Sequence, residues 1–165
     1  MDLGTTIIIA ILVALTVVPI WVMRRNRLKK ESHMMQALKE IASRQNGEIS
    51  QYEFCGDYVI GIDTKNKYVF FYKKNNKDVH TQFVNLAAVQ NCKVEKITKS
   101  FKQGTGDGNI EFTARLELHF LPKAADNAIT KLELFDEKIN SQLTGEIQMA
   151  SKWAKLINGL MHNKQ

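Results

Sequence analysis

The sequence predicts an α+β protein in which an N-terminal transmembrane helix precedes an antiparallel β-sandwich or barrel of six to seven strands, closed by one C-terminal amphipathic helix. Three observations predict this fold. Residues 5–23 carry no charged side chain, residues 48–136 have the pattern of short strands between turns, and residues 146–161 return to helical spacing. The expected division is an extracytoplasmic tip at 1–4, a membrane helix at 5–23, a basic juxtamembrane segment and linker helix at 24–47, and the β domain at 48–165.

The apolar segment Thr5–Met23 has the length of a membrane span. As a helix its 19 residues extend roughly 28 Å, close to the thickness of a hydrocarbon core. A secretory signal peptide is the alternative, but it would carry its positive charges before the apolar run and small residues after it. Because cytoplasmic flanks retain basic residues, we expect a single-pass protein of the cell membrane with its N-terminus outside and its C-terminal domain in the cytoplasm. The expected membrane-interface residues are Trp21, Arg24, Arg25, Arg27, Lys29 and Lys30.

The charge is concentrated beside this segment. The chain has a formal charge of +6, of which residues 1–23 carry −1 and residues 24–30 carry +5, which leaves +2 for residues 31–165. A nucleic-acid-binding domain would be expected to carry its basic surface on the folded part. The sequence therefore argues against nucleic acid as a partner.

The middle of the chain alternates between elements and turns. Residues 31–45 have helical spacing that ends at Asn46-Gly47, and this helix either rests on the β domain or forms a stalk. Strands are expected at Ile49–Phe54, Tyr58–Asp63, Tyr68–Lys74, Asp78–Val84, Cys92–Phe101, Asn109–Leu121 and Ile129–Asp136.

The strand at Asn109–Leu121 has the clearest pattern. Apolar and polar residues alternate along it, which predicts one face in the core and one face in water. The final helix, residues 146–161, carries an apolar stripe that must pack against the sheet. We expect a shared core of Ile110, Phe112, Leu116, Leu118, Phe120, Trp153 and Ile157, with Glu117 and His119 on the wet face.

An antiparallel meander followed by one C-terminal helix with a buried tryptophan resembles the pleckstrin-homology-like superfold. The segments that carry the resemblance are YVIGID, KYVFFYKK, NLAAV, NIEFTARLELHFL, KLELFD and KWAKLI. Bacterial membrane proteins with a single anchor and such a domain are a recognisable type. The resemblance implies a module that binds peptides along a sheet edge, scaffolds a protein complex or holds an anionic lipid headgroup.

In the lipid-binding members, basic residues near the first hairpin hold the headgroup. The resemblance places Lys65, Lys67, Lys73 and Lys74 as possible headgroup contacts, although lysines on a hairpin are also ordinary solvated surface residues. The segment contains no arginine, which is the preferred bidentate phosphate ligand.

No motif for catalysis is present. The glycine-rich run at 104–109 lacks the Lys-Ser/Thr ending of a P-loop, and the histidines and cysteines have no metal-ligand spacing. We therefore expect no enzyme, no cofactor and no metal. The expected function is a membrane-anchored binding or scaffold module that recruits a protein partner of unknown identity. The alternatives are an accessory subunit of a membrane complex, held through its transmembrane helix, and binding of anionic lipid headgroups by the domain.

Overall fold

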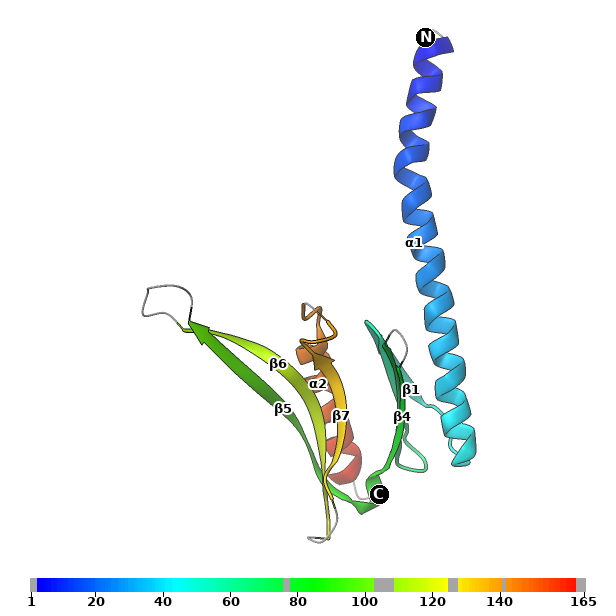
Figure 1. The fold of residues 1–165 in the computed structure, drawn as a ribbon. Coiled ribbons are helices and arrows are strands. Elements are labelled where there is room, and N and C mark those ends of the chain that lie inside the picture. The colour runs from blue at the N-terminus through cyan, green and yellow to red at the C-terminus, as the bar shows by residue number, and fades with distance from the viewer. Residues whose placement is uncertain (1–2, 76–77, 103–108, 125–127, 141, 163–165) are drawn as a thin grey trace. The chain divides into compact units, whose positions relative to one another are not determined.

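The computed structural model describes residues 3–75, 78–102, 109–124, 128–140 and 142–162, and Figure 1 shows the elements. The chain divides into two compact units, Met1–Gln36 and Ala37–Gln165. In chain order the elements are α1 (Leu3–Arg44), β1 (Gln51–Cys55), β2 (Tyr58–Asp63), β3 (Tyr68–Asn75), β4 (Asp78–Asn85), the 3-10 turn η1 (Leu86–Ala88), β5 (Val89–Lys102), β6 (Asn109–Pro122), β7 (Thr130–Asp136) and α2 (Glu146–His162).

The transmembrane helix expected at residues 5–23 is a wrong prediction. Among the residues that the structure describes, no helix combines the length and the apolar character needed to cross a bilayer. The helix does not end at Met23 but continues as α1 through the charged residues that follow, to Arg44.

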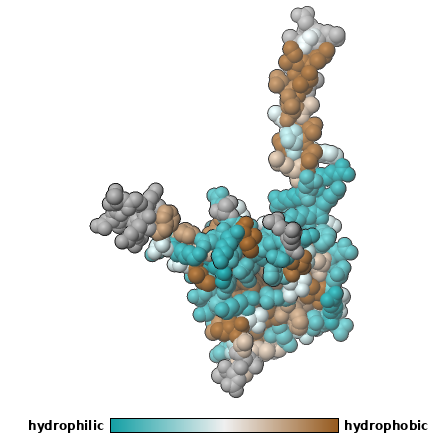
Figure 2. Space-filling model, viewed as in Figure 1, coloured by the Kyte–Doolittle hydropathy of each residue, from teal (hydrophilic) through white to brown (hydrophobic). Residues whose placement is uncertain are grey.

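The expectations that depended on that helix are corrected with it. They are the integral single-pass membrane association and the location with the N-terminus outside and the domain in the cytoplasm. The membrane-interface role expected for Trp21, Arg24, Arg25, Arg27, Lys29 and Lys30 is not tested and stays a prediction. Among these side chains, the Arg25 guanidinium lies 5.4 Å from the centre of the Trp21 ring, and Arg27 Nε donates to Glu31 Oε1 at 2.8 Å. Figure 2 shows the exposed apolar side chains along the N-terminal part of α1.

The unit from Ala37 onward contains two antiparallel sheets. One has the order β1-β2-β3-β4 and the other the order β5-β6-β7. The expectation of a β-sandwich or barrel closed by the C-terminal helix is wrong, because among the residues that the structure describes neither sheet closes on itself, and β4 and β7 end their sheets without pairing with each other. The boundaries of β2 agree with those expected from the flanking turn residues.

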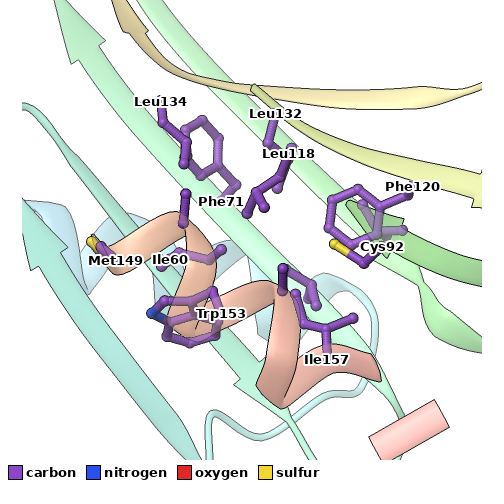
Figure 3. Close-up of a cluster of buried hydrophobic side chains, with 14 of the residues drawn as sticks. Ile60, Phe71, Cys92, Leu118, Phe120, Leu132, Leu134, Met149, Trp153 and Ile157 are labelled. Atoms are coloured by element: carbon purple, nitrogen blue, oxygen red, sulfur yellow. The ribbon is translucent and has the colours of Figure 1, made fainter. Parts of the chain in front are cut away.

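Helix α2 supplies a row of side chains to the core between the sheets. In Figure 3, Met149, Trp153 and Ile157 of α2 lie against side chains of both sheets. The predicted core membership of Leu116, Leu118, Phe120, Trp153 and Ile157 is confirmed. Phe112 is an exception with 37% of its surface exposed, because β6 runs beyond its last pairing with β7 at Arg115. The side chain of Ile110 lies outside the described residues.

The second unit includes the end of α1. Leu38 and Ala42 are buried, and a Cβ atom added to Gly61 of β2 would lie 2.8 Å from Leu38 Cδ2 and 3.3 Å from Ile49 Cγ2. The last turns of α1 therefore rest on β2, and glycine permits their close approach. The compact unit that contains the two sheets begins at Ala37.

This contact predicts a cost for any side chain at position 61. The substitution Gly61→Ala should lower the free energy of unfolding by about 1–3 kcal/mol, because the added methyl group overpacks the contact with Leu38. Gly159 in α2 is a matched control, since no atom lies within 4 Å of a Cβ added there and Gly-to-Ala changes in open helix positions stabilise by about 0.5–1 kcal/mol. Urea denaturation measures both; a neutral Gly61→Ala would contradict this packing.

The outward face of β6 is less exposed than its alternation predicts. Glu117 and His119 are buried, with 7% and 9% of their surfaces exposed. The Glu117 carboxylate lies 2.6 Å from His119 Nε2 and 3.7 Å from an Arg115 nitrogen. The expected wet face is therefore wrong at these two positions, because the side chains of Arg115, Glu117 and His119 pair with one another along β6.

Candidate functional site

The four edges of the two sheets differ in what contacts them. The backbone of β5 is bonded to α2, since the Cys92 N–H donates to Asn158 Oδ1 at 2.9 Å and Asn158 Nδ2 donates to the Cys92 carbonyl at 2.7 Å. Strand β1 is tied to α2 through Glu53, which accepts from Lys152 and Trp153 at 2.8 and 2.9 Å. These contacts place α2 at the corner between β1 and β5.

The other corner, between β4 and β7, holds a groove. In Figure 1 these strands form the facing edges of the two sheets. The groove, here called the β4–β7 groove, has a volume of approximately 610 Å³. Its lining comes from β3 (Phe71, Lys73), β4 (Val79, His80, Thr81, Gln82), β7 (Lys131, Glu133, Asp136) and the following turn (Ile139).

Lys73 connects the two sheets at the base of this groove. Its side chain is only 1% exposed, and its Nζ donates to the backbone carbonyl of Glu133 at 3.3 Å and to the carboxylate of Glu133 at 3.2 Å. A buried ammonium needs such partners, because an unpaired charge in the interior is costly. The backbone carbonyl of β7 at position 133 is thereby satisfied.

The edge of β4 has no comparable contact. Among the described residues, no group outside β3 is hydrogen bonded to the backbone of residues 79–84. Six of the eight residues of β4 are exposed before the buried Val84 is reached, and Val79 and Phe83 are exposed apolar side chains on it. β4 is therefore an edge strand with unpaired backbone groups beside a groove.

The carboxylates of the groove are engaged by cations of the chain itself. Arg115 donates to Asp136 Oδ2 from Nη2 at 3.1 Å, and its Nε lies 3.5 Å from Glu133 Oε2. Burial raises the pKa of Asp136, but hydrogen bonds from the Lys138 backbone and from Arg115 lower it by more. The pKa of Asp136 therefore lies below its ordinary value. Hydrogen bonding to Asp136 likewise raises the pKa of Arg115 above its ordinary value, outweighing the effect of burial.

The structure does not bring the four sequence-predicted lysines together. Lys65 is exposed and Lys67 half-buried in the turn between β2 and β3, whereas Lys73 and Lys74 lie near the opposite end of β3. Lys73 is five positions after Tyr68 on β3, which is a distance of roughly 17 Å along the strand. Lys74 is exposed, but Lys73 is buried and already paired with Glu133. These lysines form no common anion site.

The described residues give little support to a metal site or to a reactive cysteine. No group of three or more His, Cys, Asp and Glu side chains there could hold a metal ion. Burial raises the pKa of the Cys92 thiol to about 12, and burial is also the main cause of the raised pKa of Cys55. Both thiols are therefore protonated at neutral pH, which is the opposite of an activated nucleophile.

Sequence reasoning identified Asp78–Val84 as a strand but missed its role at the groove. The exposed apolar residues of the groove, Val79 and Ile139, come from segments more than fifty residues apart. A possible signal was the strand itself, whose apolar residues are few and interrupted by polar ones, as is usual at a sheet edge. No sequence signal indicated that β7 would be its neighbour.

No protein-family model, curated protein or solved structure matches the chain.

Proposed function

We propose that residues 37–165 form a pleckstrin-homology-like binding module that takes up an extended segment of a partner protein along the free edge of β4. The observation that carries this proposal is the unpaired backbone of β4 beside the β4–β7 groove. The module acts by binding and recruitment, not by catalysis.

The β4 edge suits this function better than the other edges. Asn158 already occupies backbone groups of β5, Lys73 occupies the Glu133 carbonyl of β7, and α2 lies beside β1, where it is bonded to the Glu53 side chain. A strand that adds to β4 gains main-chain hydrogen bonds, which supply affinity without depending on sequence. Its alternate side chains then point toward the groove, where Phe71, Val79 and Ile139 provide apolar contacts.

The element order supports the pleckstrin-homology-like part of the proposal. Four strands in meander order are followed by three more and then by α2, with Trp153 on its buried side. The placement of the lysines gives no support to lipid headgroup binding. Lys65 and Lys67 lie at one end of β3, and Lys73 and Lys74 lie at the other end.

Peptide selection tests the proposal. Short random peptides displayed on phage are selected against the full-length chain, and their affinities are measured for variants. We expect peptides whose affinity falls at least about tenfold in the double variant Val79→Ser, Ile139→Ser, because two apolar contacts of the groove are lost.

Two other exposed isoleucines provide the matched control. Ile97 of β5 and Ile129 before β7 are 41% and 45% exposed, close to the 52% and 48% of Val79 and Ile139, and they do not line the groove. The double variant Ile97→Ser, Ile129→Ser should bind the same peptides as the wild type does. Selection of no peptide, or of peptides that bind both double variants equally, would refute the proposal.

A further inference from the structure

The charges that line the β4–β7 groove are not equally available to a ligand. Glu133 is shared between Lys73 and Arg115, and Asp136 accepts from Arg115 and from the Lys138 backbone. A cationic ligand would have to displace these partners before it could use either carboxylate. The acidic residues of the groove are therefore poor contacts for a basic segment.

The available charge of the groove is positive. Lys131 of β7 is exposed, and within the described parts of the chain its side chain has no hydrogen bond or ion pair. Lys73, by contrast, is 1% exposed, and its Nζ donates to the carbonyl and to the carboxylate of Glu133, so it is not available to a ligand. The available ammonium of the groove lining is that of Lys131.

Neighbouring positions on the second sheet reinforce this sign. Lys131 pairs across the sheet with His119, and His119 pairs with Lys93 on the other side. The Glu117 carboxylate lies 3.7 Å from an Arg115 nitrogen and 2.6 Å from His119 Nε2. It is therefore already paired with residues of β6. Lys93 lies 3.5 Å from Glu95, so Lys131 is the cation of this row that is available at the groove.

From this distribution we infer that the segment bound by the groove is an acidic one, with an aspartate or glutamate placed at Lys131 and an apolar side chain between Val79 and Ile139. This inference rests on the proposed function, since it names the partner class of the same groove. The carboxylate of the ligand accepts from Lys131. Exposed charge pairs of this kind favour the matching partner and are screened by salt.

Paired peptides test the charge requirement. Each peptide that loses affinity for the Val79→Ser, Ile139→Ser variant is synthesised in its selected form and with its acidic residue changed to the amide or to lysine. Fluorescence anisotropy with the full-length chain should show roughly fivefold weaker binding of the amide form, the upper range for one exposed ion pair. Added salt should reduce this difference.

Charge reversal on the protein completes the test. Lys131→Glu should abolish the preference for the acidic form and favour the lysine form, whereas Lys155→Glu, on an exposed position of α2, should leave the preference unchanged. Groove-dependent peptides without acidic residues, or a preference unaffected by Lys131→Glu, would overturn this inference while leaving the proposed function intact. Failure to obtain any groove-dependent peptide would overturn both.

Discussion

Replacing Trp153 by alanine should lower the free energy of unfolding by about 3–5 kcal/mol, the usual range for a buried large aromatic side chain. Trp153 is 3% exposed and packs in the core shared by the two sheets and α2. Its Nε1 also donates to Glu53 of β1 at 2.9 Å. The substitution therefore leaves a cavity and removes one of the bonds that hold α2 beside β1. Urea denaturation followed by circular dichroism measures the effect.

Trp21 provides the matched control, because it is a tryptophan on a helix with 58% of its surface exposed. Trp21→Ala should change the unfolding free energy of the second unit by no more than about 0.5 kcal/mol, as is usual for surface substitutions. If the two tryptophan variants were equally stable, α2 would not be packed into the core as described.

The second large effect is expected at Asp63, which organises the turn between β2 and β3. Its side chain has no exposed surface, and its carboxylate accepts from the backbone N–H groups of Glu48, Lys65 and Asn66 at 2.8–2.9 Å. Asp63→Ala leaves these donors without their acceptor. Because hydrogen bonds to a charged group contribute about 1.5–3 kcal/mol each, the expected loss of stability is at least about 3 kcal/mol. Asp78→Ala, at an exposed position of β4, is the control and should be nearly neutral.

Asp63 also predicts a pH dependence. Burial raises its pKa, but hydrogen bonds from Asn66, Glu48 and Lys65 lower it more, so that the folded-state pKa lies below the ordinary value. Its contribution is therefore complete above the unfolded-state pKa of about 3.9 and is lost as pH falls through the lower folded-state pKa. The wild type should lose stability over this acidic range more steeply than Asp63→Asn. If the stability of the two proteins falls equally with pH over this range, the assignment of the pH dependence to Asp63 is contradicted.

Local patterns in the sequence predicted the strands better than they predicted their surroundings. The turn residues around YVIGID set the limits of β2, and the stripe on residues 146–161 indicated the buried face of α2. The alternation of apolar and polar residues along Asn109–Leu121 predicted the wrong exposure for Phe112 and for Glu117. Phe112 is exposed because, within the described residues, β7 pairs with β6 only as far as Arg115, and Glu117 is buried beside Arg115 and His119 of its own strand. Both outcomes depend on side-chain and strand contacts that the alternation of apolar and polar residues does not specify.

The candidate site was the least predictable part. Lys73 has the same surroundings in sequence as Lys74, but its side chain points inward, beside Phe71 in the register of β3, and reaches Glu133 across the domain. The groove exists because β4 and β7 are the last strands of their sheets. The order of strands in a sheet depends on tertiary packing. The pattern of strands along the sequence therefore does not predict which sheet edge stays unpaired.

The most direct test of peptide addition to β4 is amide hydrogen exchange of the full-length chain, measured residue by residue with and without a saturating selected peptide. In the free protein, the edge-facing amides of β4 should exchange quickly, because they lack a bonded partner. The peptide should slow exchange at alternate residues of Asp78–Asn85 and leave the edge of β1, Gln51–Cys55, unchanged. Unchanged exchange throughout β4 with the peptide bound, or protection confined to other strands, would contradict the account.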